Sequence, residues 1–188
     1  GQHQASSFDM VLKNLRKLRS AFLDGDCDYF LEVGGDNPPP RNTIKRLMGM
    51  QVDVAAGLCY YRARQGNLQE AGAPMAFLYT WSLDELPDDL EPELKEQFQL
   101  AFVNSPLVVP LHYAKNWQKL SVIKPYVGGT GMVLIKRNVL ERVGWHLPYS
   151  KLFSEDLYFF HQCNMHGYST ACDAKFHVPH FHEDGLMF

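Results

Sequence analysis

Apolar side chains recur every three or four residues over the first part of the chain, with basic side chains between them. The apolar positions are Phe8, Val11, Leu15, Leu18 and Phe22, and the basic ones are Lys13, Arg16, Lys17 and Arg19. This pattern predicts an amphipathic helix from about residue 7 to residue 23. The sequence Asp24-Gly25-Asp26 is expected to end it.

Short apolar runs separated by turn residues follow this helix. Residues 29–33 predict a buried strand that ends at a loop, residues 34–40, which contains three consecutive prolines. A short helix is expected from Asn42-Thr43 to about Gly49, and a second apolar strand over residues 52–61.

Residues 62–120 form a looser stretch that prolines and glycines interrupt repeatedly. Within it, residues 75–81 favour a strand and residues 90–102 a helix. No internal repeat is present, and the stretch is too apolar and aromatic for a disordered linker.

Regular patterning returns at residue 125 and continues almost to the end of the chain. The predicted elements are a strand at Tyr126-Val127, a glycine turn at 128–131, an apolar segment at 132–135, helices at 137–143 and 154–166 separated by a loop at 145–153, and strands at 168–172 and 175–181. Strands that alternate with helices indicate an α/β fold with a mostly parallel central sheet flanked by helices.

The composition is that of an ordinary globular domain. With 188 residues, of which 46% are hydrophobic and 21% charged, we expect a single domain over residues 1–188. The net charge of −3 argues against a strongly basic nucleic-acid binder, so no nucleic-acid partner is expected. No apolar run approaches the ~18 residues of a transmembrane segment, and no signal-peptide pattern opens the chain.

The cysteines bear on the cellular compartment. None of the four, Cys27, Cys59, Cys163 and Cys172, belongs to a CxxC pair, and all lie beside apolar or aromatic residues. They are interpreted as free thiols in a reducing environment, which predicts a cytoplasmic protein.

Three segments contain candidate chemistry, and each also has a structural explanation. Asp36 follows a buried strand, where open α/β sheets place ligands, although Gly34-Gly35-Asp36-Asn37 is also ordinary turn sequence. The turn Gly128-Gly129-Thr130-Gly131 lacks the ending of a P-loop and is otherwise a structural turn. In Ser154-Glu155-Asp156, Ser154 can cap a helix, and Asp156 is either a candidate general base or a helix-capping residue.

Three histidines lie close together near the end of the chain. Alternation along a strand would put His180 and His182 on one face and His177 on the other, which argues against a compact structural zinc site. One histidine of the His180/His182 pair could instead join Asp36 on a catalytic divalent cation, and His177 is expected to point into the other layer.

Taken in order, these pieces resemble the family-2-like glycosyltransferases of the GT-A fold over roughly residues 7–182. The most specific parts are GTGMVLIKRNVLERV, the SED about 20 residues later, and the Gly-Tyr followed by a terminal histidine. The resemblance implies an inverting, metal-assisted transfer of a sugar from a nucleotide-sugar donor to the hydroxyl of a carbohydrate or other acceptor. Acceptor choice would lie in the variable insert, residues 62–120.

The resemblance also implies roles for individual residues. The second Asp of the family's Asp-x-Asp motif, which binds Mn²⁺ or Mg²⁺, falls on Asp36, and the late histidine of the family falls best on His180. Asp156 would be the general base and Glu155 would orient a substrate. The segment Gly129-Thr130-Gly131 would lie near the donor sugar and the acceptor.

Two features depart from the family pattern. Gly34 replaces the first Asp of the motif; Glu32 could partly supply the missing carboxylate, or face a cleft as an ordinary strand residue. If the loop tolerates a side chain, Gly34→Asp should tighten metal binding. No segment of this chain matches the βαβ unit that grips the nucleotide base in the family, so either the sequence is truncated at its amino terminus or the protein lacks this half of the site. The alternatives are therefore a non-catalytic GT-A domain that binds a sugar, a nucleotide or a protein, and a structural domain whose aromatic insert forms an interface.

Overall fold

The computed structural model describes residues 2–61, 64–65, 68–69, 73–74, 76–80, 92, 96, 107–110, 119–146 and 154–179. The described helices are α1 (Gln2–Asp24), α2 (Thr43–Gly49), α4 (Arg137–Arg142) and α5 (Glu155–Met165). The main strands are β1 (Tyr29–Val33), β2 (Val54–Leu58), β9 (Val122–Ile123), β10 (Tyr126–Gly128), β11 (Met132–Lys136) and β12 (Thr170–His177). Shorter or separate strands are β3 (Tyr60–Tyr61), β4 (Arg64–Gln65), β5 (Leu68–Gln69), β6 (Ala73–Pro74), β7 (Ala76–Thr80) and β8 (Leu107–Pro110).

The described central sheet has five strands in the order β1-β11-β2-β12-β9. Only β12 and β2 pair in parallel; β1 with β11, β11 with β2, and β12 with β9 are antiparallel. The α/β class expected from the sequence is confirmed, but the mostly parallel sheet is wrong. Other described strands pair as β10-β7-β8, β3-β6 and β4-β5.

The direction of β11 explains this error. Its sequence, MVLIK, is a nearly continuous apolar run, and its first four residues are buried. Such runs are typical of strands covered on both faces, which occur mainly in parallel sheets. Here the run is an antiparallel strand inserted between two strands of the same direction, β1 and β2. The burial pattern reports how a strand is covered, and it does not fix the direction of the strand.

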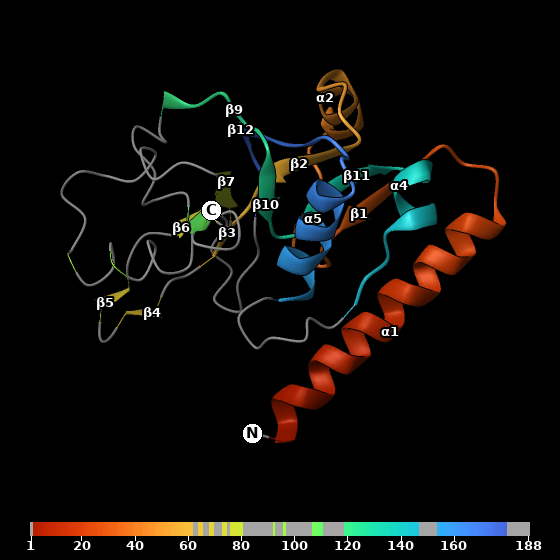
Figure 1. Ribbon diagram of the computed structural model, residues 1–188, viewed down its shortest axis with the longest axis horizontal. Coiled ribbons are helices and arrows are strands. Elements are labelled where there is room, and N and C mark those ends of the chain that lie inside the picture. The colour runs from red at the N-terminus through yellow and green to blue at the C-terminus, as the bar shows by residue number, and fades with distance from the viewer. Residues whose placement is uncertain are drawn as a thin grey trace.

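Helices cover both faces of this sheet (Figure 1). On one face, Leu47 of α2 packs with Ala55, Met132 and Leu134. On the other face, the buried cluster joins α1, α4 and α5 to alternate positions of the same strands; its members include Leu12, Leu15, Val54, Val133, Ile135, Leu140 and Phe159. The period-two alternation of β2 and β11 therefore divides their side chains between two cores.

Strand β12 is one continuous strand, not the two segments expected at 168–172 and 175–181. Its register against β2 shifts between Asp173 and His177. Cys172 faces the core that contains α5, whereas Phe176, four residues later, packs in the core that contains α2. Such a shift exchanges the faces of the residues that follow it, and His177 is exposed rather than packed into a layer.

Several other helices and strands lie close to the ranges that the sequence predicts. The first helix begins at Gln2, and the strand expected over 52–61 is divided at Cys59 into β2 and β3. The strand near 75–81 and the helices near 43–49, 137–143 and 154–166 are present. Most of the helix expected at 90–102, and the loop at 147–153, lie outside the described residues. No helix among the described residues is long and apolar enough to cross a membrane.

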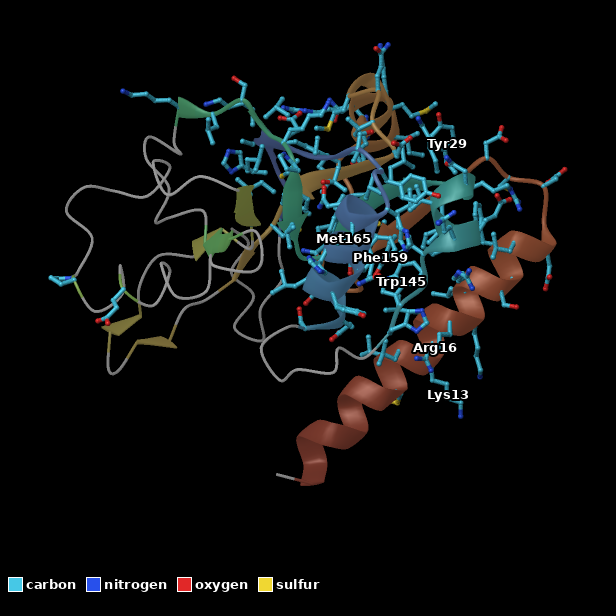
Figure 2. All side chains as sticks on the ribbon, in the orientation of Figure 1. Lys13, Arg16, Tyr29, Trp145, Phe159 and Met165 are labelled. Carbon is cyan, nitrogen blue, oxygen red and sulfur yellow. The ribbon has the colours of Figure 1, made fainter. Side chains whose placement is uncertain are left out.

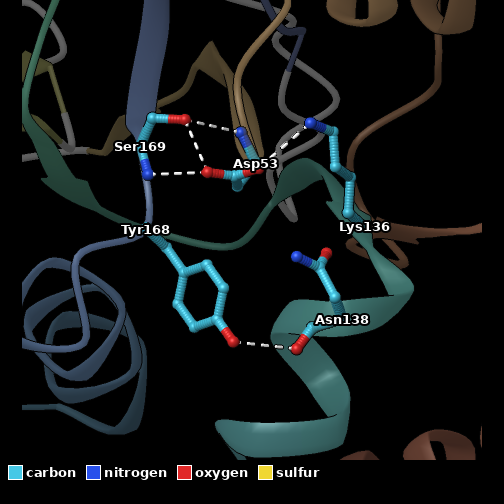
Figure 3. A network of polar contacts seen from close by, with 5 residues as sticks. All are labelled: Asp53, Lys136, Asn138, Tyr168 and Ser169. Carbon is cyan, nitrogen blue, oxygen red and sulfur yellow. Dashed lines mark hydrogen bonds and ion pairs between the residues drawn. The ribbon is translucent and has the colours of Figure 1, made fainter.

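A polar network joins the amino-terminal ends of β2 and β12 to the end of β11 (Figure 3). The Asp53 carboxylate accepts hydrogen bonds from the backbone N–H and the hydroxyl of Ser169 at 2.9 and 2.7 Å, and from Lys136 Nζ at 3.0 Å. Partial burial opposes ionisation of Asp53, but these donors outweigh it and hold its pKa below the usual range. The network therefore fixes the edge of the sheet opposite to the carboxyl ends of β1, β2 and β12.

Helix α1 runs along α4, and its amino-terminal half projects beyond the other described elements (Figure 1). Arg16 points from α1 toward Trp145 (Figure 2) and donates to its carbonyl at 3.1 Å. The Trp145 ring stacks on Phe159 of α5, with the ring centroids 4.9 Å apart. The basic face of α1 thus contacts the rest of the described fold through hydrogen bonds from its side chains to backbone carbonyls.

Arg137, the first residue of α4, holds the carboxyl-terminal end of α1. Its guanidinium donates to the carbonyls of Phe22, Leu23, Gly25 and Cys27 at 2.7–3.2 Å. It also lies over the Phe22 ring, 4.8 Å from the centroid. A helix end leaves carbonyl groups without intrahelical partners, and here one side chain satisfies several of them.

Replacing Arg137 by lysine should therefore cost stability although the charge is kept. A lysine ammonium cannot reproduce the planar set of donors, so we expect Arg137→Lys to lower the free energy of unfolding by about 1–3 kcal/mol in urea titrations. Arg142→Lys is the control, because this residue is exposed and the contact of its Nε with His166 is long, at 3.4 Å. Equal effects of the two variants would contradict this role of Arg137.

Candidate active site

The candidate site lies where the carboxyl ends of β1, β2 and β12 meet the beginning of β11. These three strands run in one direction and β11 in the opposite one, so Val33 at the end of β1 faces Met132 at the start of β11. Beyond this pair, the Gly34 N–H donates to the Gly131 carbonyl at 2.8 Å. The loop after β1 and the glycine turn before β11 are thereby joined at one edge of the sheet.

Asp156 reaches this edge from the first turn of α5. Its carboxylate accepts a hydrogen bond from the Thr130 hydroxyl at 2.9 Å and another from the Thr130 backbone N–H at 3.3 Å. The capping role that the sequence left open for Asp156 belongs to Ser154, whose Oγ accepts from the Leu157 N–H. The Asp156 side chain is therefore directed at the glycine turn, away from the helix backbone.

Two further carboxyl groups surround Asp156. Glu155 is only 8% exposed, and Glu32 on β1 is hydrogen-bonded to Thr130. One oxygen of each, Oε2, is buried without a hydrogen-bond partner among the described residues. Buried polar atoms are normally satisfied, so these two oxygens mark a place where donors from a ligand or water would be stabilising.

Burial dominates the electrostatics of this cluster. It raises the pKa of Asp156 to about 6; the Thr130 hydroxyl opposes the shift and the charge of Glu155 adds to it. Burial, followed by the charge of Asp156, raises the pKa of Glu32 to about 8. Near neutral pH, Asp156 is therefore mainly ionised while Glu32 mainly retains its proton. A carboxylate with a pKa just below neutrality is suited to accepting a proton.

Asp36 lies on the exposed loop beside this cluster. Its Oδ1 is 3.1 Å from the position that a Cβ on Gly34 would occupy, so the carboxylate is turned back toward the end of β1. The charges of Asp36 and Asp156 both help to raise the pKa of the Cys59 thiol to about 12, with burial as the largest cause. The structure therefore brings the two predicted acidic residues to the same edge, around Cys59.

The glycine turn provides more than flexibility. Thr130 is buried and contacts both Glu32 and Asp156. A Cβ on Gly131 would lie 2.7 Å from Asn37 Oδ1 and 2.9 Å from Cys59 Sγ, so no larger residue fits there without rearrangement. Gly129 is also buried, next to Thr130.

The predicted metal ligands are only partly described. Asp36 is at the edge, whereas His180 and His182 lie outside the described residues. No group of three histidine, cysteine, aspartate or glutamate side chains in the described part of the chain could hold a metal ion.

Sequence reasoning named Glu32 as a partial substitute for the missing carboxylate of the motif, or as an ordinary strand residue facing a cleft, and it assigned no site role to Asn37 or Cys59. A signal was present for Glu32, because it is the one charged residue in the strand YFLEV and half of such positions face a core. For Asn37 and Cys59 no such signal exists: an asparagine in a Gly-Pro loop and a cysteine after a strand are ordinary in those places.

Comparisons with known proteins leave the family open. No protein-family model matches the chain, and no curated protein matches it. Among solved structures, the crystal structure of A197 from STIV is similar to it, with a TM-score of 0.49, 18% sequence identity, and coverage of 94% of this chain and 70% of the A197 chain. A likeness of this size carries no argument about function.

The raised pKa of Glu32 predicts a pH-dependent loss of stability. The Glu32 carboxyl group binds its proton more tightly in the folded chain than in the unfolded chain, where its pKa is near 4.5. The stability that this proton contributes to the fold therefore falls as pH rises toward about 8. Glu32→Gln keeps the shape and cannot ionise. In urea titrations between pH 5 and pH 8, the free energy of unfolding of the variant should rise relative to that of the wild type by about 3 kcal/mol. The exposed Glu141→Gln should show no such trend, and parallel curves for Glu32→Gln would contradict the burial of an ionisable Glu32.

Gly34 is expected to resist the substitution that would restore the Asp-x-Asp motif. A Cβ on Gly34 would lie 2.4 Å from Asn37 Oδ1, and Asn37 is buried and hydrogen-bonded. Gly34→Asp should therefore lower stability by roughly 1–3 kcal/mol rather than simply add a ligand. Gly35→Asp is the matched control, since nothing lies within 4 Å of a Cβ there. Equal midpoints of thermal unfolding for the two variants would contradict this account.

Proposed function

We propose that this protein is an inverting glycosyltransferase of the GT-A type, which moves a sugar from a nucleotide-sugar donor to an acceptor hydroxyl. The observation that carries the proposal is the Asp156 carboxylate, held by Thr130 at the edge where β1 and β2 end, beside Asp36. Open α/β sheets bind ligands at such edges. The resemblance of the sequence motifs to family-2-like enzymes assigns the chemistry, and the geometry is compatible with it.

In the proposed reaction, Asp156 removes the proton of the acceptor hydroxyl as the hydroxyl oxygen attacks the anomeric carbon. A new carbon–oxygen bond forms on one face of the sugar, while the bond to the diphosphate breaks on the other, which inverts the configuration. Thr130 restrains the carboxylate through two hydrogen bonds, so that its orientation is set before the substrates arrive. Glu155 and the mainly protonated Glu32 line the same place and would hydrogen-bond substrate hydroxyls.

A divalent ion, Mn²⁺ or Mg²⁺, is part of the proposal. Asp36 offers the hard oxygen ligand that these ions prefer, with His180 as the second expected protein ligand. Among the described residues, no group of three histidine, cysteine, aspartate or glutamate side chains forms such a site. When bound, such an ion would offset the negative charge that develops on the leaving diphosphate.

A non-catalytic binding domain is the second candidate, and one observation favours it. The position that holds the first Asp of the family motif, Gly34, has no room for a side chain beside Asn37. A chain that cannot bear this carboxylate could still bind a nucleotide sugar.

Cytoplasmic localisation stays a prediction from cysteine usage alone. Cys59, Cys163 and Cys172 are buried free thiols, and Cys27 is an exposed one.

Asp156→Asn should separate these candidates. The amide keeps the shape of the side chain, and Ser154 still caps α5, so the fold should change in stability by about 1 kcal/mol or less. It cannot accept a proton, so transfer should fall by about 10²–10⁴ in a donor and acceptor screen while donor affinity, measured by calorimetry, stays nearly constant.

Ser154→Ala is the matched control for this experiment. It removes the observed cap and should cost about 1 kcal/mol of stability while transfer is retained. Transfer by Asp156→Asn at more than about a tenth of the wild-type rate would move the search for the base to Glu155. If donor binds but the wild type transfers nothing to any acceptor, the binding domain becomes the better description.

A further inference from the structure

Asn37 is an anomaly in its loop. The residues just before it, Gly35 and Asp36, are exposed, yet Asn37 is only 6% exposed. A buried amide side chain needs hydrogen-bond partners, and this one has a distant partner: its Nδ2 donates to the Pro179 carbonyl, beyond the end of β12, at 3.0 Å. Its backbone N–H closes the local turn by donating to the Gly34 carbonyl at 3.0 Å.

The oxygen of the same amide, Oδ1, lies against two glycines, Gly34 and Gly131. A Cβ on Gly34 would be 2.4 Å from Asn37 Oδ1, and a Cβ on Gly131 would be 2.7 Å from it. Because Gly34 and Gly131 are also joined by a backbone hydrogen bond of 2.8 Å, Oδ1 lies over the point where the end of β1 meets the start of β11. Asn37 therefore contacts three chain segments that are far apart in sequence.

We propose that Asn37 is a positioning residue of the candidate site: its side-chain amide fixes the loop that bears Asp36 against the Thr130–Gly131 turn, and so sets where Asp36 stands relative to Asp156. The catalytic importance of Asn37 rests on the proposed function, whereas its role in placing Asp36 rests on the geometry alone. Asp36 precedes Asn37, and Asp156 is held by Thr130, which precedes Gly131. A displacement of the amide would therefore move one carboxylate without moving the other.

A spin label on the loop measures this placement without any substrate. Gly35 accepts a side chain, because nothing apart from its own chain neighbours lies within 4 Å of a Cβ there. Gly35→Cys would bear a nitroxide in a Cys27→Ser background, since Cys27 is the exposed cysteine and the other three are buried. The readout is the paramagnetic broadening of the backbone amide signals of Thr130, Gly131 and Asp156 in the full chain.

With Asn37 present, we expect strong and uniform broadening of these three signals. In Asn37→Ala the amide anchor is lost, and the broadening at Thr130 and Asp156 should fall at least twofold while the spectrum remains that of a folded chain. Asn42→Ala is the control, because Asn42 is exposed and its side chain does not cap α2. If Asn37→Ala is not folded, Asn37→Asp keeps the shape, loses the donor to Pro179, and should show the same fall.

Unchanged broadening in a folded Asn37 variant would overturn the proposal, because a residue that merely adds stability does not set a distance in the folded state. Transfer kinetics then test the catalytic meaning: Asn37→Ala should lower kcat at least tenfold at saturating acceptor, and Asn42→Ala should not. A wild type without transfer would defeat the proposed function and leave the spin-label result standing, so the two failures are distinguishable.

Discussion

The reversed direction of β11 is the constraint on which the candidate site depends. Because β11 starts at the edge where β1, β2 and β12 end, the turn that precedes it, with Thr130 and Gly131, is delivered to the loop that follows β1. A parallel strand at this place would deliver its amino-terminal turn to the opposite edge, near Asp53 and Ser169. One strand direction thus decides which two turns share a site.

Burial then gives the assembled groups their chemistry. Glu32 lies on a strand, Asp156 on a helix and Thr130 in a turn, and their convergence leaves little water around the carboxyl groups. Removing water from several carboxyl groups at once disfavours full ionisation, so they titrate in sequence, with Asp156 ionising first and Glu32 keeping its proton to about pH 8. The cluster therefore contains both a proton acceptor and a proton donor near neutral pH. A fold selected only for stability gains nothing from this arrangement, because an apolar residue at position 32 would remove the cost of burying the carboxyl group.

Much of this could be predicted from the sequence, for identifiable reasons. The amphipathic period of α1, the apolar run of β1 and the Ser154 cap of α5 are local signals, and each produced the expected element near its expected place. Strand direction, the register shift in β12 and the contact of Glu32 with Thr130 depend on residues about 100 positions apart, which no local pattern encodes. Asp36 and Asp156 were predictable as candidate site residues because each adjoins the end of an element. Glu32 lies inside a strand, so the sequence left its site role open against that of an ordinary strand residue.

Gly34 shows how packing changes the meaning of a departure from a family pattern. Taken as sequence, it is a missing carboxylate that weakens a metal site. In the structure it is the space that Asn37 Oδ1 requires, and Gly131 provides the same space from the other side. An aspartate at position 34 and a buried asparagine at position 37 are mutually exclusive in this geometry. The loop after β1 is anchored by the Asn37 amide and bears a single exposed carboxylate, Asp36. With aspartate at position 34 it would bear two carboxylates, which would repel each other. The absence of the first aspartate is thus coupled to the presence of Asn37, and neither position can be interpreted without the other.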